Sequence, residues 1–331
     1  MKNHIVRVAR SAACSITIIA CGIGAIALPA LAQSYPNRPV TFIVPFTPGT
    51  GIDIIARTFG QQLTQRWGQP FIIDNRAGAS GNIGAEMVAT AKPDGYTLMV
   101  TATSLVTNAA VNKNPRYDPL KSFEAISLVA TGIMSLLVSN ETPAMSVKEL
   151  IAYARQRPGE LNYASSGNGT PQHLSMELLK LEAGVDLTHI PFKGTAPAIT
   201  DTVAGRVNAM FMPIHTALPF LLRNQLRMLA VVAAERSPVV PNVPTMKEAG
   251  FPGIQVENWY GVMAPAATPA EIVTRINSEI NAMLKTPETS GMLSKQGLQP
   301  IGGAPSRLTD LIRSEQQRWP RVVAAARIAA D

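Results

Sequence analysis

Short apolar segments alternate with amphipathic helical segments along most of this 331-residue chain. Runs rich in Val, Ile and Phe are typical of buried strands, and apolar residues spaced by three and four positions indicate helices between them. The expected strands are 40–44, 70–74, 96–101, 123–128, 133–138, 162–164, 187–190, 209–212, 228–232 and 256–263. The expected helices are 52–66, 82–91, 147–156, 196–204, one opening at Thr170-Pro171, one opening at Thr268, and 306–328 with a break at Pro320. This order predicts an α/β fold with parallel-rich sheets and helices on both faces.

Two of these strands are expected to carry the chain between two domains. The strand 133–138 leaves the first domain, and the strand 256–263 returns to it. The first domain is therefore predicted to be discontinuous, over 33–132 and 256–331, and the second to span 133–255.

Three capping boxes predict helix starts, because a Ser or Thr at the N-cap and a Glu three residues later satisfy each other's backbone N–H groups. They are Ser146 with Glu149, Thr245 with Glu248, and Thr268 with Glu271.

The first 32 residues are predicted to be a signal peptide cleaved after Ala32. Lys2, Arg7 and Arg10 precede an uncharged apolar run over 12–28, and Ala30-Leu31-Ala32 fits the small-x-small cleavage rule. We therefore expect export to the periplasm. Two alternatives stay open: a transmembrane anchor, and a lipobox over 18–21 in which an acylated Cys21 becomes the first residue.

Cysteine content and charge exclude several classes of function. Cys14 and Cys21 both lie in the predicted signal peptide, so the mature chain has no thiol for a disulfide, a nucleophile or a metal site. The formal net charge is +7, and three of the positive charges lie in the same segment. The remaining Lys and Arg residues are scattered, which argues against a nucleic-acid partner.

Four loops rich in Gly, Thr and Ser run into expected helices, over 45–53, 75–84, 165–173 and 192–197. The first N–H groups of a helix have no intrahelical partner, and the helix dipole favours negative charge there. Such loops predict a site for a small carboxylate and indicate a binding protein rather than an enzyme.

Nine segments in register carry a family resemblance. They are 35–39, 45–53, 75–84, 93–98, 163–174, 191–194, 229–231, 241–250 and 259–261. They include Pro-Asp-Gly-Tyr-Thr-Leu at 93–98 and Trp-Tyr-Gly at 259–261. In these segments the chain resembles the substrate-binding proteins of the tripartite tricarboxylate transporter system, the Bug family.

The resemblance implies a two-lobed periplasmic binding protein, type II-like, with a ligand cleft between the lobes. It implies a small carboxylate ligand, of the classes that include tricarboxylates, dicarboxylates, acidic amino acids and aromatic acids, held by backbone amides, hydroxyls and ordered waters. It also implies delivery to integral-membrane permease subunits. It implies no cofactor. Capture by hinge closure is expected, because a ligand that contacts both lobes favours the closed state. We expect a monomer.

The candidate ligand-binding residues come from the four loops and the ends of the neighbouring strands. They are Phe46, Thr47, Gly49, Thr50, Gly51, Ala79, Ser80, Thr103, Ser104, Ser165, Ser166, Gly167, Gly169, Thr170, Phe192, Lys193, Gly194, Thr195 and Met212. Asp53, Asn82 and His173 are expected to have structural roles near the site. No metal is expected, because His173 and Glu177 are two ligands on one helix and no third is evident.

The chain departs from the family pattern at two places. Thr47 and Thr50 stand in a loop that usually reads Pro-Phe-Ala-Pro-Gly-Gly, and a β-branched Thr50 does not readily take a positive φ. Met212 and Pro213 replace an Asp-Asn pair that many relatives have after this strand. Without that acid to hold an ammonium group, we expect an acidic ligand that is not an amino acid and has some apolar bulk, such as an aromatic or medium-chain dicarboxylate.

Two other functions stay open. A binding protein of this kind can serve a sensory system instead of a permease. An exported hydrolase is the less favoured alternative, because no Gly-x-Ser-x-Gly motif is present and His173, His189 and His215 lie in no recognisable catalytic motif.

Overall fold

The computed structural model describes residues 35–112, 114–325 and 328. The predicted signal peptide, with Cys14, Cys21 and the cleavage site after Ala32, lies outside these residues. All helices and strands below belong to the compact unit Arg38–Asp331.

The described strands and helices follow the predicted alternation for most of the chain. The strands are β1 (Val40–Val44), β2 (Phe71–Asn75), β3 (Thr97–Ala102), β4 (Phe123–Gly132), β5 (Met134–Ser139), β6 (Asn162–Ser165), β7 (Thr188–Pro191), β8 (Ala209–Pro213), β9 (Leu226–Val232), β10 (Asn258–Pro265) and β11 (Leu298–Pro300). The helices are α1 (Gly51–Trp67), the short 3-10 helix η1 (Ala79–Gly81), α2 (Asn82–Ala89), α3 (Ser104–Val111), α4 (Val147–Arg155), α5 (Pro171–Ala183), α6 (Thr195–Val203), α7 (Ile214–Leu222), α8 (Ala270–Leu284), α9 (Pro287–Lys295) and α10 (Pro305–Ala325).

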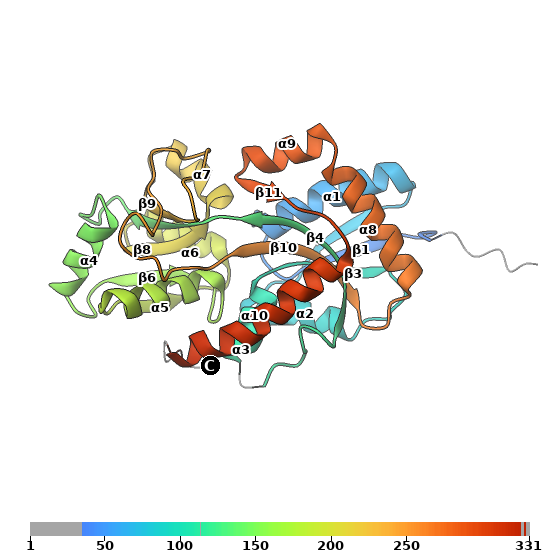
Figure 1. Cartoon of the computed structure of the whole chain (residues 1–331), viewed down its shortest axis with the longest axis horizontal. Helices are drawn as coiled ribbons and strands as arrows, with labels where there is room; N and C mark the ends of the chain where they lie inside the picture. Colours follow the sequence, from blue (N-terminus) through green and yellow to red (C-terminus); the bar gives the residue numbers. More distant parts are fainter. Residues whose placement is uncertain (1–34, 113, 326–327, 329–331) are drawn as a thin grey trace, which may run out of the picture. The chain divides into compact units, whose positions relative to one another are not determined.

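A six-stranded sheet, in the order β11-β4-β10-β3-β1-β2, forms the centre of what we call the first lobe. β1 pairs in parallel with β2 and β3, as the βαβαβ pattern predicts. β10 pairs antiparallel with both β3 and β4, and β11 pairs antiparallel with β4, so the sheet is mixed. Helices α1 and α8 pack on one side of it, and α2, α3 and α10 on the other (Figure 1).

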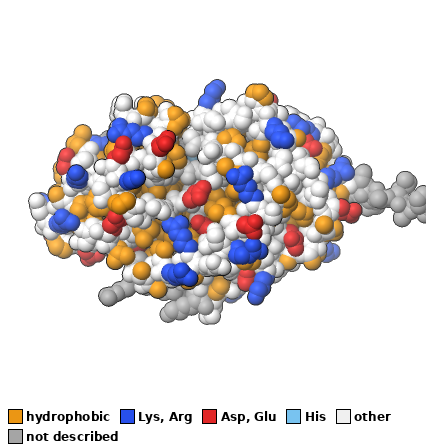
Figure 2. Space-filling view, viewed as in Figure 1, with side chains coloured by type: hydrophobic (Ala, Val, Ile, Leu, Met, Phe, Trp, Pro, Cys, Tyr) orange, Lys and Arg blue, Asp and Glu red, His pale blue; other side chains and the backbone are white. Residues whose placement is uncertain are grey.

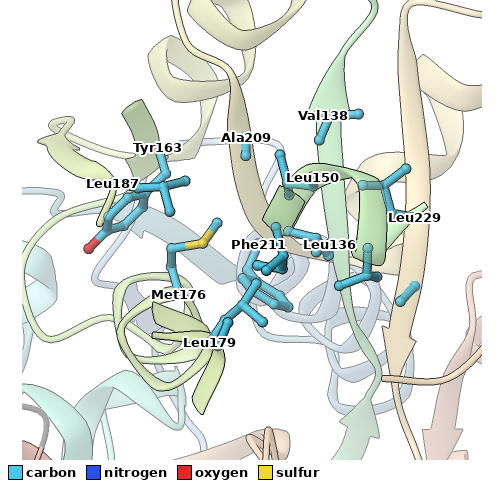
Figure 3. Packing of buried hydrophobic residues seen from close by; sticks show 14 of the residues in the cluster. Leu136, Val138, Leu150, Tyr163, Met176, Leu179, Leu187, Ala209, Phe211 and Leu229 are labelled. Carbon is cyan, nitrogen blue, oxygen red and sulfur yellow. The ribbon is translucent and has the colours of Figure 1, made fainter. Parts of the chain in front are cut away.

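A five-stranded sheet, in the order β7-β6-β8-β5-β9, forms the centre of the second lobe. Its side chains alternate between two cores, as the period of a strand requires. Leu136, Tyr163 and Phe211 point to the face covered by α4 and α5, where they pack with Leu150, Met176 and Leu179 (Figure 3). Their neighbours Leu137, Ala164, Met210 and Met212 belong to a second cluster that includes Ala198 of α6 and Ala217 of α7.

Two strands link the lobes. β4 of the first sheet ends at Gly132, and β5 of the second sheet begins at Met134. The chain returns as β10, which pairs with β4 along its whole length, from Asn258 opposite Gly132 to Pro265 opposite Phe123. Figure 1 shows β4 and β10 running side by side.

Several local predictions are wrong. Helices α3, α7 and α9 and strand β11 are not among the expected elements. Helix α10 continues through Pro320, because Trp319 is fully buried and Val322 and Val323 pack against the same core. Thr245 and Glu248 exchange their capping hydrogen bonds, but on a turn and not on a helix. At Thr268, the hydroxyl donates back to the carbonyl of Pro265, and Pro269 is the N-cap of α8.

The surface shown in Figure 2 carries basic and acidic side chains interspersed, as their scattered positions in the sequence predict. Among the described helices, none is both long and apolar enough to cross a lipid bilayer.

Candidate functional site

An uncharged cavity with about 450 Å³ of empty space, its mouth included, is lined by residues of both lobes. The lining residues are Phe46, Thr50, Gly51, Ile52, Ala102, Ser104, Met134, Ser166, Pro171, Gln172, Thr195, Pro213, Thr216, Asn258 and Tyr260. None of them carries a formal charge. The walls combine apolar side chains with hydroxyl and amide groups, which is typical of a site for a small organic molecule.

Five helices begin at this cavity. Its lining includes the first residues of α1 (Gly51), α3 (Ser104), α5 (Pro171) and α6 (Thr195), together with Thr216 in the first turn of α7. Each helix start offers backbone N–H groups and the positive end of a dipole. The convergence of five such ends suits a carboxylate without the help of a lysine or arginine.

Thr50 gives the first loop its shape. It is the N-cap of α1 with φ of −77°, and its hydroxyl accepts a hydrogen bond from the N–H of Asp53. Gly49 takes the positive φ, +82°, in its place. The β-branched Thr50 therefore needs no positive φ, because it serves as the helix cap, a role for which Thr is well suited.

Asp53 fixes this loop through hydrogen bonds of its buried carboxylate. Its carboxylate accepts hydrogen bonds from the Gly49 N–H at 2.9 Å, from Arg57 at 2.9 Å and from Asn75 at 3.0 Å. Burial alone would raise the pKa of Asp53, but these hydrogen bonds and the Arg57 charge outweigh it and lower the pKa. Asp53 thus fixes the loop that precedes α1 through these hydrogen bonds.

A second compartment has about 740 Å³ of empty space and shares Phe46 and Ser166 with the first. It is lined by Phe46, Ala77, Gly78, Ala79, Ser80, Gly81, Ser166, Gly167, Asn168, Pro191, Phe192, Lys193 and Gly194. Lys193 is the charged residue of this lining. Ala79 and Ser80 have positive φ values of 44° and 57°, which are strained for residues with a β-carbon and are often found at functional loops.

Loops of the two lobes touch across these compartments. A β-carbon on Gly167 would stand 2.3 Å from Oγ of Ser80, and one on Gly194 would stand 3.0 Å from Cγ2 of Thr47. A β-carbon on Gly51 would stand 2.1 Å from Nε2 of His215. These three approaches are possible because the residue on one side is a glycine.

The structure brings together twelve of the predicted ligand-binding residues. Those lining the first cavity are Phe46, Thr50, Gly51, Ser104, Ser166 and Thr195. Those lining the second compartment, in addition to Phe46 and Ser166, are Ala79, Ser80, Gly167, Phe192, Lys193 and Gly194.

The other candidates line neither compartment. Thr47 and Gly49 belong to the loop 45–53, between the lining residues Phe46 and Thr50. Thr103 is fully buried, where its hydroxyl donates to the carbonyl of Glu257 and accepts from the N–H of Trp259. Met212 is also fully buried and lies in the apolar cluster with Ala198 and Ala217. Its neighbour Pro213, and not Met212, reaches the cavity.

Ser165, Gly169 and Thr170 build the loop of the second lobe from within. The Ser165 hydroxyl accepts from the N–H of Gly167 and lies 2.7 Å from Nε2 of His189. The Thr170 hydroxyl donates to the carbonyl of Gly167 at 2.7 Å, although Thr170 is the N-cap of α5. The position of Thr170 was predicted, but its side chain closes the loop behind it instead of capping the helix.

His173 and Asn82 take structural positions. Nδ1 of His173 accepts from the N–H of Gly169 at 3.1 Å, and its ring stacks on His189 with 4.0 Å between centroids. Burial lowers the pKa of His173 to about 4, with a smaller contribution from Lys180. The side-chain oxygen Oδ1 of Asn82 accepts a hydrogen bond from the Tyr117 hydroxyl at 3.0 Å. Over the described part of the chain, no cluster of three or more His, Cys, Asp or Glu side chains suits a metal ion.

The sequence did not predict two polar residues that line the first cavity. Asn258 and Tyr260 line it from β10, and the amide of Asn258 donates to the Tyr260 hydroxyl. That hydroxyl lies 3.3 Å from Nε2 of His215. The Trp-Tyr-Gly segment was noted as a motif, but nothing in the sequence showed that β10 lies beside β3 and thereby reaches the cavity.

Known proteins resemble this chain over most of its length. The model of the family described as "Tripartite tricarboxylate transporter family receptor" matches residues 55–328. A UPF0065 protein from the tcbD-tcbE intergenic region of Pseudomonas sp. (strain P51) is 38% identical over 300 residues, which cover 90% of this chain and 89% of that protein. Protein BugT of Bordetella pertussis is 35% identical over 300 residues, covering 90% of this chain and 92% of that protein.

Solved structures of related proteins share the fold of this chain. A structure titled "R. palustris Rpa4515 with adipate" is 40% identical, has a TM-score of 0.86 and covers 89% of this chain and 99% of its own. The structure of the periplasmic binding protein BugD is 31% identical with a TM-score of 0.85, covering 89% and 99%. The family model describes a transporter receptor, and the solved structures include a periplasmic binding protein and a periplasmic transporter. The chain belongs to the tripartite tricarboxylate transporter receptors, which include the Bug proteins, and is a solute-binding protein rather than an enzyme.

Proposed function

We propose that this receptor captures a dicarboxylate with an apolar middle, closes its two lobes around it, and delivers it to the membrane permease of its transporter. The observation that carries the proposal is the convergence of five helix starts on a cavity without charged lining residues. The helix starts suit a carboxylate, and Phe46, Ile52 and Met134 suit methylene groups.

The comparison with solved structures supports this ligand class. The neighbour at 40% identity was crystallised with adipate, and another from Rhodopseudomonas palustris, 35% identical with a TM-score of 0.84, has bound malate. An amino acid ligand is disfavoured, because neither compartment has an Asp or Glu in its lining to pair with an ammonium group.

A calorimetric titration tests the ligand class. Succinate, glutarate, adipate, pimelate, malate, citrate, terephthalate and glutamate are compared on the same preparation. We expect the tightest binding among the unsubstituted dicarboxylates. In a denaturation experiment, a hundredfold excess of ligand over Kd should raise the free energy of unfolding by about 2.7 kcal/mol. Tight binding of glutamate, with none for adipate or its neighbours in length, would overturn the assignment.

Hinge closure is tested by small-angle scattering with and without saturating adipate. A decrease of the radius of gyration is expected, and an unchanged value contradicts closure. Sedimentation of the same samples tests the proposed monomer.

Delivery to a permease is tested by uptake of labelled adipate in cells with and without the protein. Loss of uptake supports transport. Unchanged uptake together with a lost transcriptional response would favour the sensory alternative. Mass spectrometry of the mature N-terminus tests whether cleavage follows Ala32 or an acylated Cys21 anchors the protein.

A further inference from the structure

His215 lies at the junction of the two lobes, directly behind the ligand cavity. It is the second residue of α7 in the second lobe, and its neighbours Pro213 and Thr216 line the cavity. Its ring contacts two residues of the first lobe that also line the cavity: Tyr260 through a 3.3 Å hydrogen bond, and Gly51 through close packing. His215 itself is only 6% exposed.

The surroundings of His215 suit a neutral ring. Nε2 has the Tyr260 hydroxyl as its partner, whereas Nδ1 is buried and has no hydrogen-bond partner among the described residues. A protonated imidazolium has two N–H donors and a full charge, so it would bury an unpaired, charged donor. Such a group is much more costly to bury than a neutral nitrogen.

Among the residues that the structure describes, no acidic side chain pairs with this ring. Two elements of the first lobe pack against the ring. On β10, the titratable residue is Tyr260. In the first turn of α1, the titratable residue is Asp53, and its carboxylate already accepts hydrogen bonds from Gly49, Arg57 and Asn75. Helix α7 carries no other titratable residue. Burial lowers the pKa of His215 to about 4, and no neighbouring charge contributes to that shift.

We propose that His215 is a positioning residue that makes ligand capture proton-linked: the lobes close on the neutral imidazole, and a proton on His215 holds them open. The inference rests on the closure proposed above. When the lobes separate, α7 moves away from Gly51 and Tyr260, water reaches the ring, and its affinity for a proton returns toward that of an ordinary histidine. Closure must then expel that proton, so acid weakens binding.

The sign and size follow from linkage. The closed state disfavours the proton, so affinity is complete above the pKa of the open state and falls as the pH drops below it. With an ordinary pKa of about 6.5 in the open state and about 4 in the closed state, adipate binding weakens about tenfold between pH 7.5 and pH 5.5.

The test is calorimetric titration of adipate at pH 7.5 and pH 5.5 with the wild-type receptor and with His215→Gln, a neutral side chain of similar reach. Adipate also takes up protons in this range, and it does so equally for both proteins. The inference predicts that the wild type loses about tenfold more affinity than His215→Gln. Leu222→Gln introduces the same side chain at the exposed end of α7; it is the matched control and should follow the wild type.

Equal pH dependence in the wild type and His215→Gln would overturn the inference while leaving dicarboxylate binding intact. Absence of adipate binding at both pH values would instead contradict the proposed function. If His215→Gln fails to fold, Tyr260→Phe provides a second variant. It removes the hydroxyl partner but keeps the buried ring, so its affinity should retain the wild-type dependence on pH, and loss of that dependence would count against the inference.

Discussion

The side chain of Thr47 lies directly against Gly194, so that a β-carbon on Gly194 would stand 3.0 Å from its Cγ2 and 3.1 Å from its Oγ1. These two residues belong to different lobes. Gly194 precedes α6 and has a φ of +120°, a conformation that residues with a side chain rarely adopt. The lobes therefore meet at a point where one methyl group decides how closely they approach.

We expect Gly194→Ala to weaken adipate binding, because the added methyl group obstructs the closed arrangement. Overpacking of this kind costs about 1–3 kcal/mol, which corresponds to an affinity about five- to 150-fold lower. Calorimetric titration measures it. Gly184→Ala is the matched control, since Gly184 also has a positive φ, +61°, but a β-carbon there meets nothing within 4 Å. An equal loss of affinity in both variants would contradict the steric explanation.

Thr195→Val tests the hydroxyl at the start of α6. The change keeps the shape of the side chain and removes a polar group that lines the cavity. Loss of one hydrogen bond, at about 0.5–1.5 kcal/mol, lowers the adipate affinity about two- to tenfold. Thr200→Val, on the exposed side of the same helix, loses only a bond to its own backbone at Ala196 and should bind adipate as the wild type does. Wild-type affinity in Thr195→Val would remove this hydroxyl from the site.

Asp53→Asn should destabilise the first loop, because the neutral amide loses the Arg57 ion pair and offers one acceptor in place of two. The expected loss in the free energy of unfolding at pH 7 is about 1–3 kcal/mol, measured by urea denaturation. The pKa of Asp53 is lowered in the folded state, so its contribution is present above the ordinary value of 3.8 and disappears as the pH falls below it. Wild type and variant should therefore converge in acid.

Asp310→Asn is the control for Asp53, because Asp310 pairs with Arg313 at the surface and is largely exposed. Exposed pairs contribute about 0–1 kcal/mol. A loss in Asp310→Asn as large as that in Asp53→Asn would show that the loop contacts are not the cause.

Glu315→Gln should be neutral or stabilising at pH 7. The Glu315 carboxylate is buried and accepts hydrogen bonds from the indole N–H groups of Trp259, at 3.2 Å, and Trp319, at 3.0 Å. Burial raises its pKa, and the two tryptophans offset only part of that effect. An acid with a raised pKa makes the protein less stable as the pH rises through that value. The wild type should therefore gain stability from pH 8 to pH 5, and Glu315→Gln should gain less.

Glu315→Leu separates charge from hydrogen bonding, because it leaves both indole groups unpaired. An unpaired buried donor costs about 1–3 kcal/mol, so this variant should be clearly less stable than Glu315→Gln in urea denaturation. Equal stability of the two variants would show that the acceptor oxygen does not matter.

The sequence predicted most strands and amphipathic helices because each of them has one clear apolar period. The missed helices lack it. Residues of α3, from Ser104 to Val111, are buried on nearly every side, so their apolar pattern has no single face. Helix α7 contains Pro219, a residue that usually ends a helix. In α10 the opposite happens, since burial of Trp319 keeps the helix intact across Pro320.

The loops of the candidate site were predicted by their Gly and Thr residues, but their partners were not. Met212 was expected at the cavity because it ends a predicted strand, yet the strand's alternation turns it toward α6 and α7. Asn258 and Tyr260 reach the site only because β10 lies between β3 and β4. Tyr260 also meets His215 of the second lobe there. Strand order is set by packing among distant segments, and local sequence patterns carry no record of it.

The place of β10 also decides when this protein can fold during synthesis. Strands β3 and β4 are made early, but each pairs with β10, and β10 is complete only at Pro265. The second lobe, from β5 to β9, is continuous and needs no later residue to complete its sheet. A nascent chain can therefore complete the sheet of the second lobe first, while β3 and β4 keep unpaired edges until about four fifths of the polypeptide has been made.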